Sequence, residues 1–132
     1  MFTVEVKHEF SNKDISLLLA DALEMSSRYW MEVAGRDKRL KPLNFANTES
    51  GDEHFTHISF PMNVGGYITI VDTENENKEH VLDLSAIEKG LRLMAKDKTY
   101  AFRFSNIVKG DYDATDSDCF LQFAVLGEVL YG

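Results

Sequence analysis

The chain has 132 residues, the usual size of a single domain, and is long enough to bury a core without metal ions or disulfides. Hydrophobic residues make up 44% of it, with one Trp, five Tyr and nine Phe, which excludes a generally disordered chain. The formal net charge of −8 argues against binding to a nucleic-acid backbone, which requires clustered Lys and Arg.

The acidic excess lies in the second part of the chain. Residues 1–46 carry seven acidic and seven basic side chains, whereas residues 47–132 carry fifteen acidic and seven basic ones. Such an excess either maintains solubility, which is its ordinary role, or forms a face that meets a basic partner. Both interpretations stay open on the sequence alone.

Cysteine usage and the N-terminal pattern predict a cytoplasmic protein. Cys119 is the only cysteine, so an intramolecular disulfide and a multi-cysteine metal site are both excluded. The first ten residues alternate apolar and polar side chains and contain no long apolar run, unlike a signal peptide or a membrane anchor. We therefore expect a reducing compartment and no contact with a membrane.

In the first half, alternation predicts a strand at residues 2–6. A cap signal at Ser11, followed by apolar residues at helical spacing, predicts a helix at 13–25. Aromatic and β-branched residues at 29–33 predict a second strand. The polar stretch at about 35–53 predicts a long loop, which is often functional or mobile when it lies inside a domain.

In the second half, strands are expected at residues 55–60 and 66–72, joined by a hairpin at Gly65 and Gly66, with a short strand at 81–84. Ser85 begins a capping-box pattern for a helix that reaches Lys96. A short helix at 100–108 and a last one starting near Asp116 or Ser117 complete the series. This order predicts one α+β domain over residues 1–132, with a mainly antiparallel sheet of about four strands and three to four helices.

An acidic cluster spans the start of the last predicted helix and carries Asp111, Asp113, Asp116 and Asp118. It opens like a calcium-binding loop, but it lacks the glycine of the turn and the closing glutamate. We therefore expect no metal here. The alternative roles are to cap the helix and to form a charged rim that contacts a partner.

Candidate catalytic residues are sparse. His54 and His57 lie three residues apart in a predicted strand and so point to opposite faces, while His8 and His80 are isolated in the sequence. Cys119 lies among apolar residues and is expected to be packed, not nucleophilic. No serine-nucleophile or phosphate-loop motif appears, so we expect no catalytic residues and no cofactor.

A possible ligand site combines aromatic and basic side chains. Arg28, Tyr29 and Trp30 are followed by a basic run that includes Arg39. Aromatic rings stack on bases and guanidinium groups bind phosphates, so these residues could hold a small nucleotide. The competing interpretation places Tyr29 and Trp30 in the core and leaves the basic run solvated.

Three segments of the chain together resemble a family of small proteins encoded by bacteriophages and prophages. They are residues 22–30 (ALEMSSRYW), residues 82–95 (LDLSAIEKGLRLMA), and residues 113–122 (DATDSDCFLQ) with the ending 127–132 (GEVLYG). The chain departs from the family at Met25 and Ser26, where relatives have two glycines, and at Arg28, where they have asparagine. The resemblance implies a phage origin and assigns no catalytic or binding residue.

A small acidic phage protein without catalytic motifs is expected to act by binding. The leading hypothesis is a non-enzymatic accessory protein that blocks a host factor, as a means of counter-defence, with the acidic cluster as its contact surface. The alternatives are sequestration of a small nucleotide immune signal by Arg28, Tyr29 and Trp30 at a subunit boundary, and an unrecognised enzyme that uses His54, His57 or Asp83. A homo-oligomer is compatible with each hypothesis.

Overall fold

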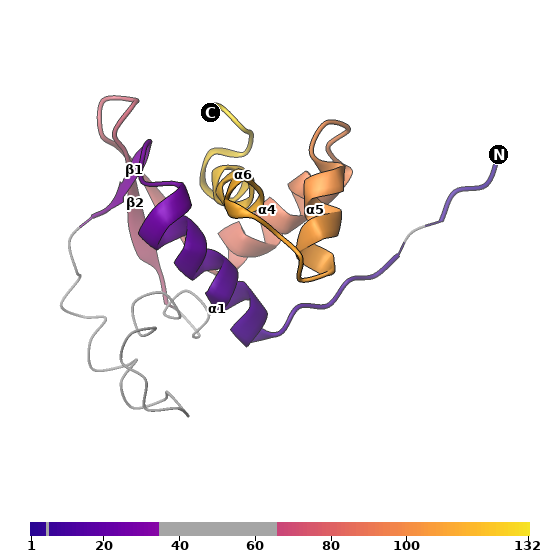
Figure 1. Cartoon of the computed structure of the whole chain (residues 1–132). Helices are drawn as coiled ribbons and strands as arrows, with labels where there is room; N and C mark the ends of the chain where they lie inside the picture. The colour runs from indigo at the N-terminus through magenta and orange to yellow at the C-terminus, as the bar shows by residue number, and fades with distance from the viewer. Residues whose placement is uncertain (5, 35–65) are drawn as a thin grey trace.

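The computed structural model describes residues 1–4, 6–34 and 66–132. These residues form a three-stranded antiparallel sheet and four α-helices, which confirms the predicted α+β fold (Figure 1). The predicted loop at 35–53, the strand at 55–60 and Gly65 of the predicted hairpin lie outside the described residues, as do His54, His57 and Arg39. The expectation of one domain over the whole chain stays a prediction.

The first helix, α1 (Asn12–Asp21), begins where Ser11 Oγ accepts a hydrogen bond of 3.1 Å from the Asp14 backbone N–H. This cap is the one that the sequence predicts. The helix continues into a π-helical turn, η1 (Ala22–Ser26), so that the helical segment ends one residue after the predicted end at 25. Five of the six buried residues of these two elements recur at helical spacing and form one apolar face, namely Ile15, Leu18, Leu19, Ala22 and Leu23; the sixth is Ala20.

The sheet has the strand order β1 (Met31–Val33), β2 (Ile68–Asp72) and β3 (Lys78–Leu82). Met31 lies opposite Asp72, and Ile68 lies opposite Leu82, in two antiparallel pairings. The predicted strand at 66–72 is confirmed from Ile68 to Asp72, as β2. The predicted strand at 29–33 is correct only from Met31, because the two residues before it belong to a turn. β3 begins earlier than predicted, because the hairpin turn is confined to residues 73–77.

The last three helices are α4 (Leu84–Lys96), α5 (Ala101–Val108) and α6 (Ala114–Leu126). The cap of α4 is Asp83 and not Ser85, since Asp83 is extended and its Oδ1 accepts a hydrogen bond of 2.8 Å from the Ala86 backbone N–H. The cap of α6 is likewise Asp113, not Asp116 or Ser117. Both predictions were displaced by two to four residues because Asp and Ser are equally good cap residues.

Helix α6 is the central element of the fold. Every residue from Asp116 to Ala124 is buried, and α6 contacts α1, η1, α4 and α5. Figure 1 shows α6 between α1 and α5. Its closest neighbour is α4, where a Cβ atom placed on Gly90 would lie 2.7 Å from Ala124 Cα. Glycine is therefore required at position 90, because any side chain there would force the two helices apart.

The N-terminal arm, residues 1–4 and 6–10, corrects the predicted strand at 2–6. The arm has no regular secondary structure and runs away from the body (Figure 1). Its alternating apolar side chains are exposed, Phe2 by 99%, Val4 by 79% and Val6 by 67%. An alternating apolar–polar sequence forms a strand only where a neighbouring strand can pair with it. None of the described strands pairs with the arm.

Only the base of the arm contacts the body. The rings of His8 and Phe10 meet Phe104 of α5 edge-on, with centroid distances of 5.4 and 6.0 Å. Such edge-to-face contacts are the preferred geometry of aromatic pairs. Within the described parts of the chain, no helix combines the length and the apolar character needed to cross a membrane.

Candidate functional site

Asp118, in the second turn of α6, is the centre of a buried hydrogen-bond cluster. Its Oδ1 accepts hydrogen bonds from Ser27 Oγ and Trp30 Nε1, each at 2.7 Å. Its Oδ2 accepts from Tyr29 OH at 2.5 Å and from Gln122 Nε2 at 3.1 Å. Four donors therefore stabilise the carboxylate and join the turn after η1 to α6.

Gln122, one turn further along α6, holds the C-terminal tail. Its Oε1 accepts hydrogen bonds of 2.9 Å from the backbone N–H groups of Leu130 and Tyr131, and its Nε2 donates to the Tyr131 carbonyl at 3.1 Å. The Tyr131 ring stacks on Trp30 with the centroids 5.7 Å apart, and its OH donates to Asp72 Oδ2 at 2.8 Å. The tail thus covers the buried indole and connects it to the sheet.

Asp116 joins α6 to α5. Its side chain, 1% exposed, accepts hydrogen bonds from Arg103 at 2.9 Å and from Asn106 at 3.2 Å. It also accepts from the backbone N–H of Asp113, and so completes the capping box of α6. The bond to Asp116 raises the pKa of the Arg103 guanidinium, which therefore stays charged and committed to this contact.

Ser117 joins α6 to α1 and η1. Its hydroxyl donates to the Asp21 carboxylate and lies 2.9 Å from Ser26 Oγ. The side chains of consecutive helical residues point about 100° apart, as the α-helical repeat requires. The three consecutive residues 116–118 therefore bind three different neighbours of α6.

Two titratable groups, Tyr29 within this cluster and Cys119 next to Asp118 on α6, are held in their neutral forms. Burial, together with the hydrogen bond to Asp118, raises the pKa of the Tyr29 hydroxyl. Burial also raises the pKa of the Cys119 thiol to about 11, although Arg103 opposes the shift. Cys119 is 4% exposed, which confirms that it is packed, and a neutral buried thiol is a poor nucleophile.

The structure brings together residues that the sequence assigned to two different sites. Tyr29 and Trp30, predicted to hold a ligand, contact Asp118, predicted to contact a partner. Trp30 is fully buried, so it belongs to the core and offers no free face for stacking on a base. Arg28 is exposed and does not take part in the cluster, and Arg39 lies outside the described residues.

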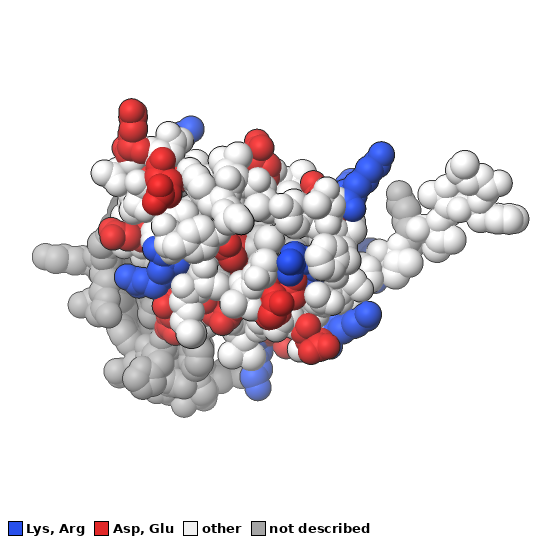
Figure 2. Space-filling view, turned by 45° about the horizontal axis from the view of Figure 1, so that its top comes forward, with Lys and Arg blue, Asp and Glu red and all other residues white. Residues whose placement is uncertain are grey.

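The predicted charged rim is not present in the form expected. Asp116 and Asp118 are buried and hydrogen-bonded, because they hold α6 to its neighbours, and only Asp111 and Asp113 are exposed. On the face shown in Figure 2, acidic side chains are dispersed and interleaved with Lys and Arg. They do not form one continuous acidic patch on that face.

Sequence reasoning missed Ser27, Arg103, Gln122 and Tyr131 as members of these clusters. Three of the four lie in the segments that carry the family resemblance, which is the signal that could have found them. In the structure these segments meet around Asp118, and a fourth motif residue, Gly90, sets the spacing of α4 and α6. Ser27, Gln122, Tyr131 and Gly90, which all lie in these segments, therefore hold parts of the fold together.

A hollow of about 430 Å³ lies beside the Asp118 cluster and the C-terminal tail. Tyr29, Tyr100, Arg103, Asp118 and Tyr131 are among the residues that line it. Its two charged side chains already have partners: Asp118 accepts four hydrogen bonds, and Arg103 binds Asp116. A phosphate group would meet carboxylates here and a cation that is already paired.

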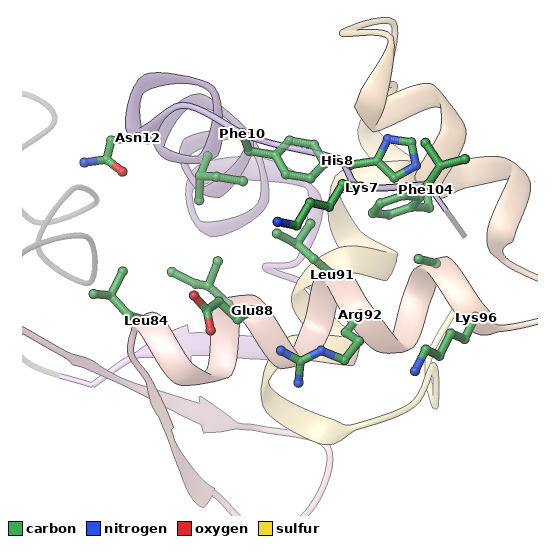
Figure 3. A pocket seen from close by; sticks show the side chains of 14 residues that line it. Lys7, His8, Phe10, Asn12, Leu84, Glu88, Leu91, Arg92, Lys96 and Phe104 are labelled. Atoms are coloured by element: carbon green, nitrogen blue, oxygen red, sulfur yellow. The ribbon is translucent and has the colours of Figure 1, made fainter. Parts of the chain in front are cut away.

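A larger groove, of about 760 Å³, lies between the N-terminal arm and α4 (Figure 3). Its floor is apolar and comes from four elements of the chain: Phe10, Ile15, Ile87, Leu91 and Phe104. Its border is basic, with Lys7 from the arm and Arg92 and Lys96 from α4. Glu88 is the one carboxylate among its described lining residues. We call this the arm–α4 groove.

Among the described residues, no three His, Cys, Asp or Glu side chains gather in a way that could hold a metal ion. Comparison of the chain with models of protein families, with curated proteins and with solved structures finds no match. The function must therefore be argued from the two hollows, the arm and the buried clusters.

Proposed function

We propose that the protein is a non-enzymatic, phage-encoded accessory protein that binds a host factor in the host cytoplasm and blocks it by protein–protein contact. Counter-defence is the biological role that we assign to this contact. The phage origin rests on the family resemblance of the three segments described above. The proposed protein–protein contact is argued from the side chains that are exposed on the surface of the protein.

The observation that carries the proposal is the exposure of the N-terminal arm. Phe2, Val4 and Val6 lie in water, although each is apolar and their exposed surface is costly. Figure 2 shows the arm projecting from the body of the protein. A partner that covers these three side chains would gain roughly 1.5–3 kcal/mol for each one that becomes fully buried. We therefore place the contact at the arm, in preference to the acidic cluster.

The chemistry of the buried clusters also favours binding over catalysis. Asp116, Ser117 and Asp118 are occupied by contacts within the protein, and Cys119 is a neutral thiol. Asp83, one of the residues named for the enzymatic alternative, caps α4. A catalytic group must reach a substrate from an accessible position with a pKa suited to proton transfer, and these groups are committed elsewhere.

The described residues give the nucleotide alternative less support. Trp30 is buried, and the hollow next to it is bordered by Asp118 and by an arginine that already pairs with Asp116. Polyphosphates need several free cations or backbone N–H groups. We therefore keep the blocking of a host factor as the proposal.

A titration of the host process against protein concentration tests blocking by contact. Blocking predicts that inhibition is complete when the protein reaches about a one-to-one ratio with its target, because each copy occupies one target. An enzyme would act well below that ratio, since each copy turns over many targets. Complete inhibition at one copy per hundred targets would exclude the proposal.

The matched variants are F2S/V4S/V6S, which makes the arm polar, and M25S/V81S/V108S, which changes three apolar side chains that are exposed elsewhere. We expect the arm variant to lose inhibition while its circular dichroism spectrum is unchanged, and the control variant to keep it. Equal inhibition by both variants would remove the arm from the contact.

A further inference from the structure

We propose that the arm–α4 groove binds an acidic, amphipathic helix of the partner protein, with apolar side chains on its floor and carboxylates at its basic border. This inference rests on the proposed function, because it names the chemistry of the segment that the partner presents. It concerns the groove beside the arm, which shares Val6 with the exposed outer part of the arm but contains neither Phe2 nor Val4.

The shape of the groove follows a helix. The residues of α4 that line it are Leu84, Ile87, Glu88, Leu91, Arg92, Ala95 and Lys96. They recur every three or four residues and so form one stripe along nearly the whole length of α4. Twelve residues of helix rise by about 18 Å, which matches about three turns of a helix lying alongside. Helices in apolar grooves use anchors at this same spacing.

The floor is apolar and only partly covered by the protein. Leu91 and Ala95 are half-buried, while Ile15, Ile87 and Phe104, which border the same space, are themselves buried in the core. The base of the arm closes one side, because His8 and Phe10 pack on Phe104. Figure 3 shows Phe10, Leu91 and Phe104 around the space between the arm and α4. Burying two or three leucine-sized side chains there would be the main source of affinity.

The border has a charge opposite to that of the whole chain. Lys7, Arg92 and Lys96 are exposed around the groove of a protein with a net charge of −8. No ion pair joins any of the three to a carboxylate of the described residues. Arg92 and Lys96 lie one turn apart, so two carboxylates one turn apart on an opposing helix would face them. Unpaired cations beside an apolar floor select an acidic partner.

The same charges argue against a polyanion or a lipid surface. A nucleic acid carries a negative charge at every phosphate, and three cations in a chain with a net charge of −8 neutralise too few of them, whereas they can match the few carboxylates of a short helix. A membrane requires a broad basic face, whereas these three cations border a single groove. A short acidic helix satisfies both the charge and the shape.

Selection from a library of random 16-residue peptides, against the immobilised full-length protein, tests the proposal. We expect the enriched peptides to carry Asp or Glu together with apolar residues at spacings of three and four. Enrichment of basic or uncharged peptides, or no enrichment at all, would overturn the proposal.

Charge reversal at the border supplies the decisive variant. We expect the R92E/K96E variant to bind the best selected peptide at least about tenfold more weakly by fluorescence anisotropy, because two attractive charge pairs become repulsive. The R28E/K109E variant makes the same charge change at two exposed residues outside the groove and is expected to bind within about twofold of the wild type. If both variants lose peptide affinity equally, the loss reflects net charge, and the proposal that the groove binds an acidic helix is overturned.

A charge-swapped peptide, with Lys in place of each Asp and Glu, completes the test. We expect this peptide to bind the R92E/K96E variant more tightly than it binds the wild-type protein. Vesicles containing phosphatidylserine should not bind to the wild type, and binding to them that depends on Arg92 and Lys96 would contradict the proposal. If R92E/K96E inhibits the host process as well as the wild type does, the groove inference fails while blocking by contact stands.

Discussion

Trp30 Nε1 donates a hydrogen bond of 2.7 Å to Asp118 Oδ1, across 88 positions of the sequence. The bond joins the turn between η1 and β1 to the central helix. Tyr131, from the C-terminal tail, stacks on the same indole ring. The segments that look most like a binding motif in the sequence therefore meet inside the protein. Their first role is to hold three parts of the chain in place.

We expect the hydrogen bonds of Asp118 to contribute several kcal/mol to the free energy of unfolding. In D118N an amide NH₂ replaces one carboxylate oxygen and faces donors, so at least one buried donor loses its acceptor. We expect the free energy of unfolding in urea to fall by about 2–4 kcal/mol. The control is D111N, at an exposed aspartate, which should change stability by no more than about 0.5 kcal/mol. Similar stabilities of the two variants would contradict the role of the cluster.

Gly90 tests the contact between α4 and α6. Alanine is a better helix former than glycine, by about 1 kcal/mol. Because the new Cβ would lie 2.7 Å from Ala124 Cα, we nevertheless expect G90A to be destabilised by about 1–3 kcal/mol. K89A, at the exposed neighbouring position, should leave stability nearly unchanged. A stabilised G90A in thermal unfolding would mean that the two helices are further apart than described.

Cys119 gives the stability a defined dependence on alkaline pH. Its folded pKa is raised to about 11 by burial, whereas the unfolded thiol ionises near its ordinary value of about 8.5. Below the unfolded pKa the contribution is fully present, and it is lost as the pH rises from about 8.5 to about 11, because only the unfolded state gives up the proton there. Urea unfolding of C119A should show a shallower loss of stability over this range than the wild type. Identical slopes would place Cys119 at the surface.

Trp30 provides an optical test of the ligand alternative, because it is the only tryptophan. We expect emission that is shifted to the blue relative to the unfolded protein and weak quenching by iodide, as for a buried indole. Added mono- and dinucleotides should leave the emission unchanged. Saturable quenching by a nucleotide would show that Trp30 is accessible to a ligand and would revive sequestration.

The sequence predicted the helices well because their signals are local. The cap at Ser11, the apolar spacing from Ile15 to Leu23 and the end at Lys96 all depend on neighbouring residues. The strand at residues 2–6 failed, because alternation describes a surface that could pair and does not supply the neighbouring strand. Caps were displaced where Asp and Ser compete, as at Asp113.

The candidate site was less predictable, because it depends on contacts between distant segments. Nothing local distinguishes Asp118, which is buried against Trp30, from Asp111, which is exposed. The arm–α4 groove likewise combines Lys7 with Arg92 and Lys96, which only the fold brings together. Composition showed an acidic chain, but it could not show where the cations gather.

Native mass spectrometry of the protein mixed with host lysate tests the central claim most directly. Blocking by contact predicts a complex with one host polypeptide at a fixed ratio, which F2S/V4S/V6S abolishes and M25S/V81S/V108S leaves intact. The wild-type protein recovered with only a small added mass, or with no adduct while the host process is still inhibited, would contradict the account.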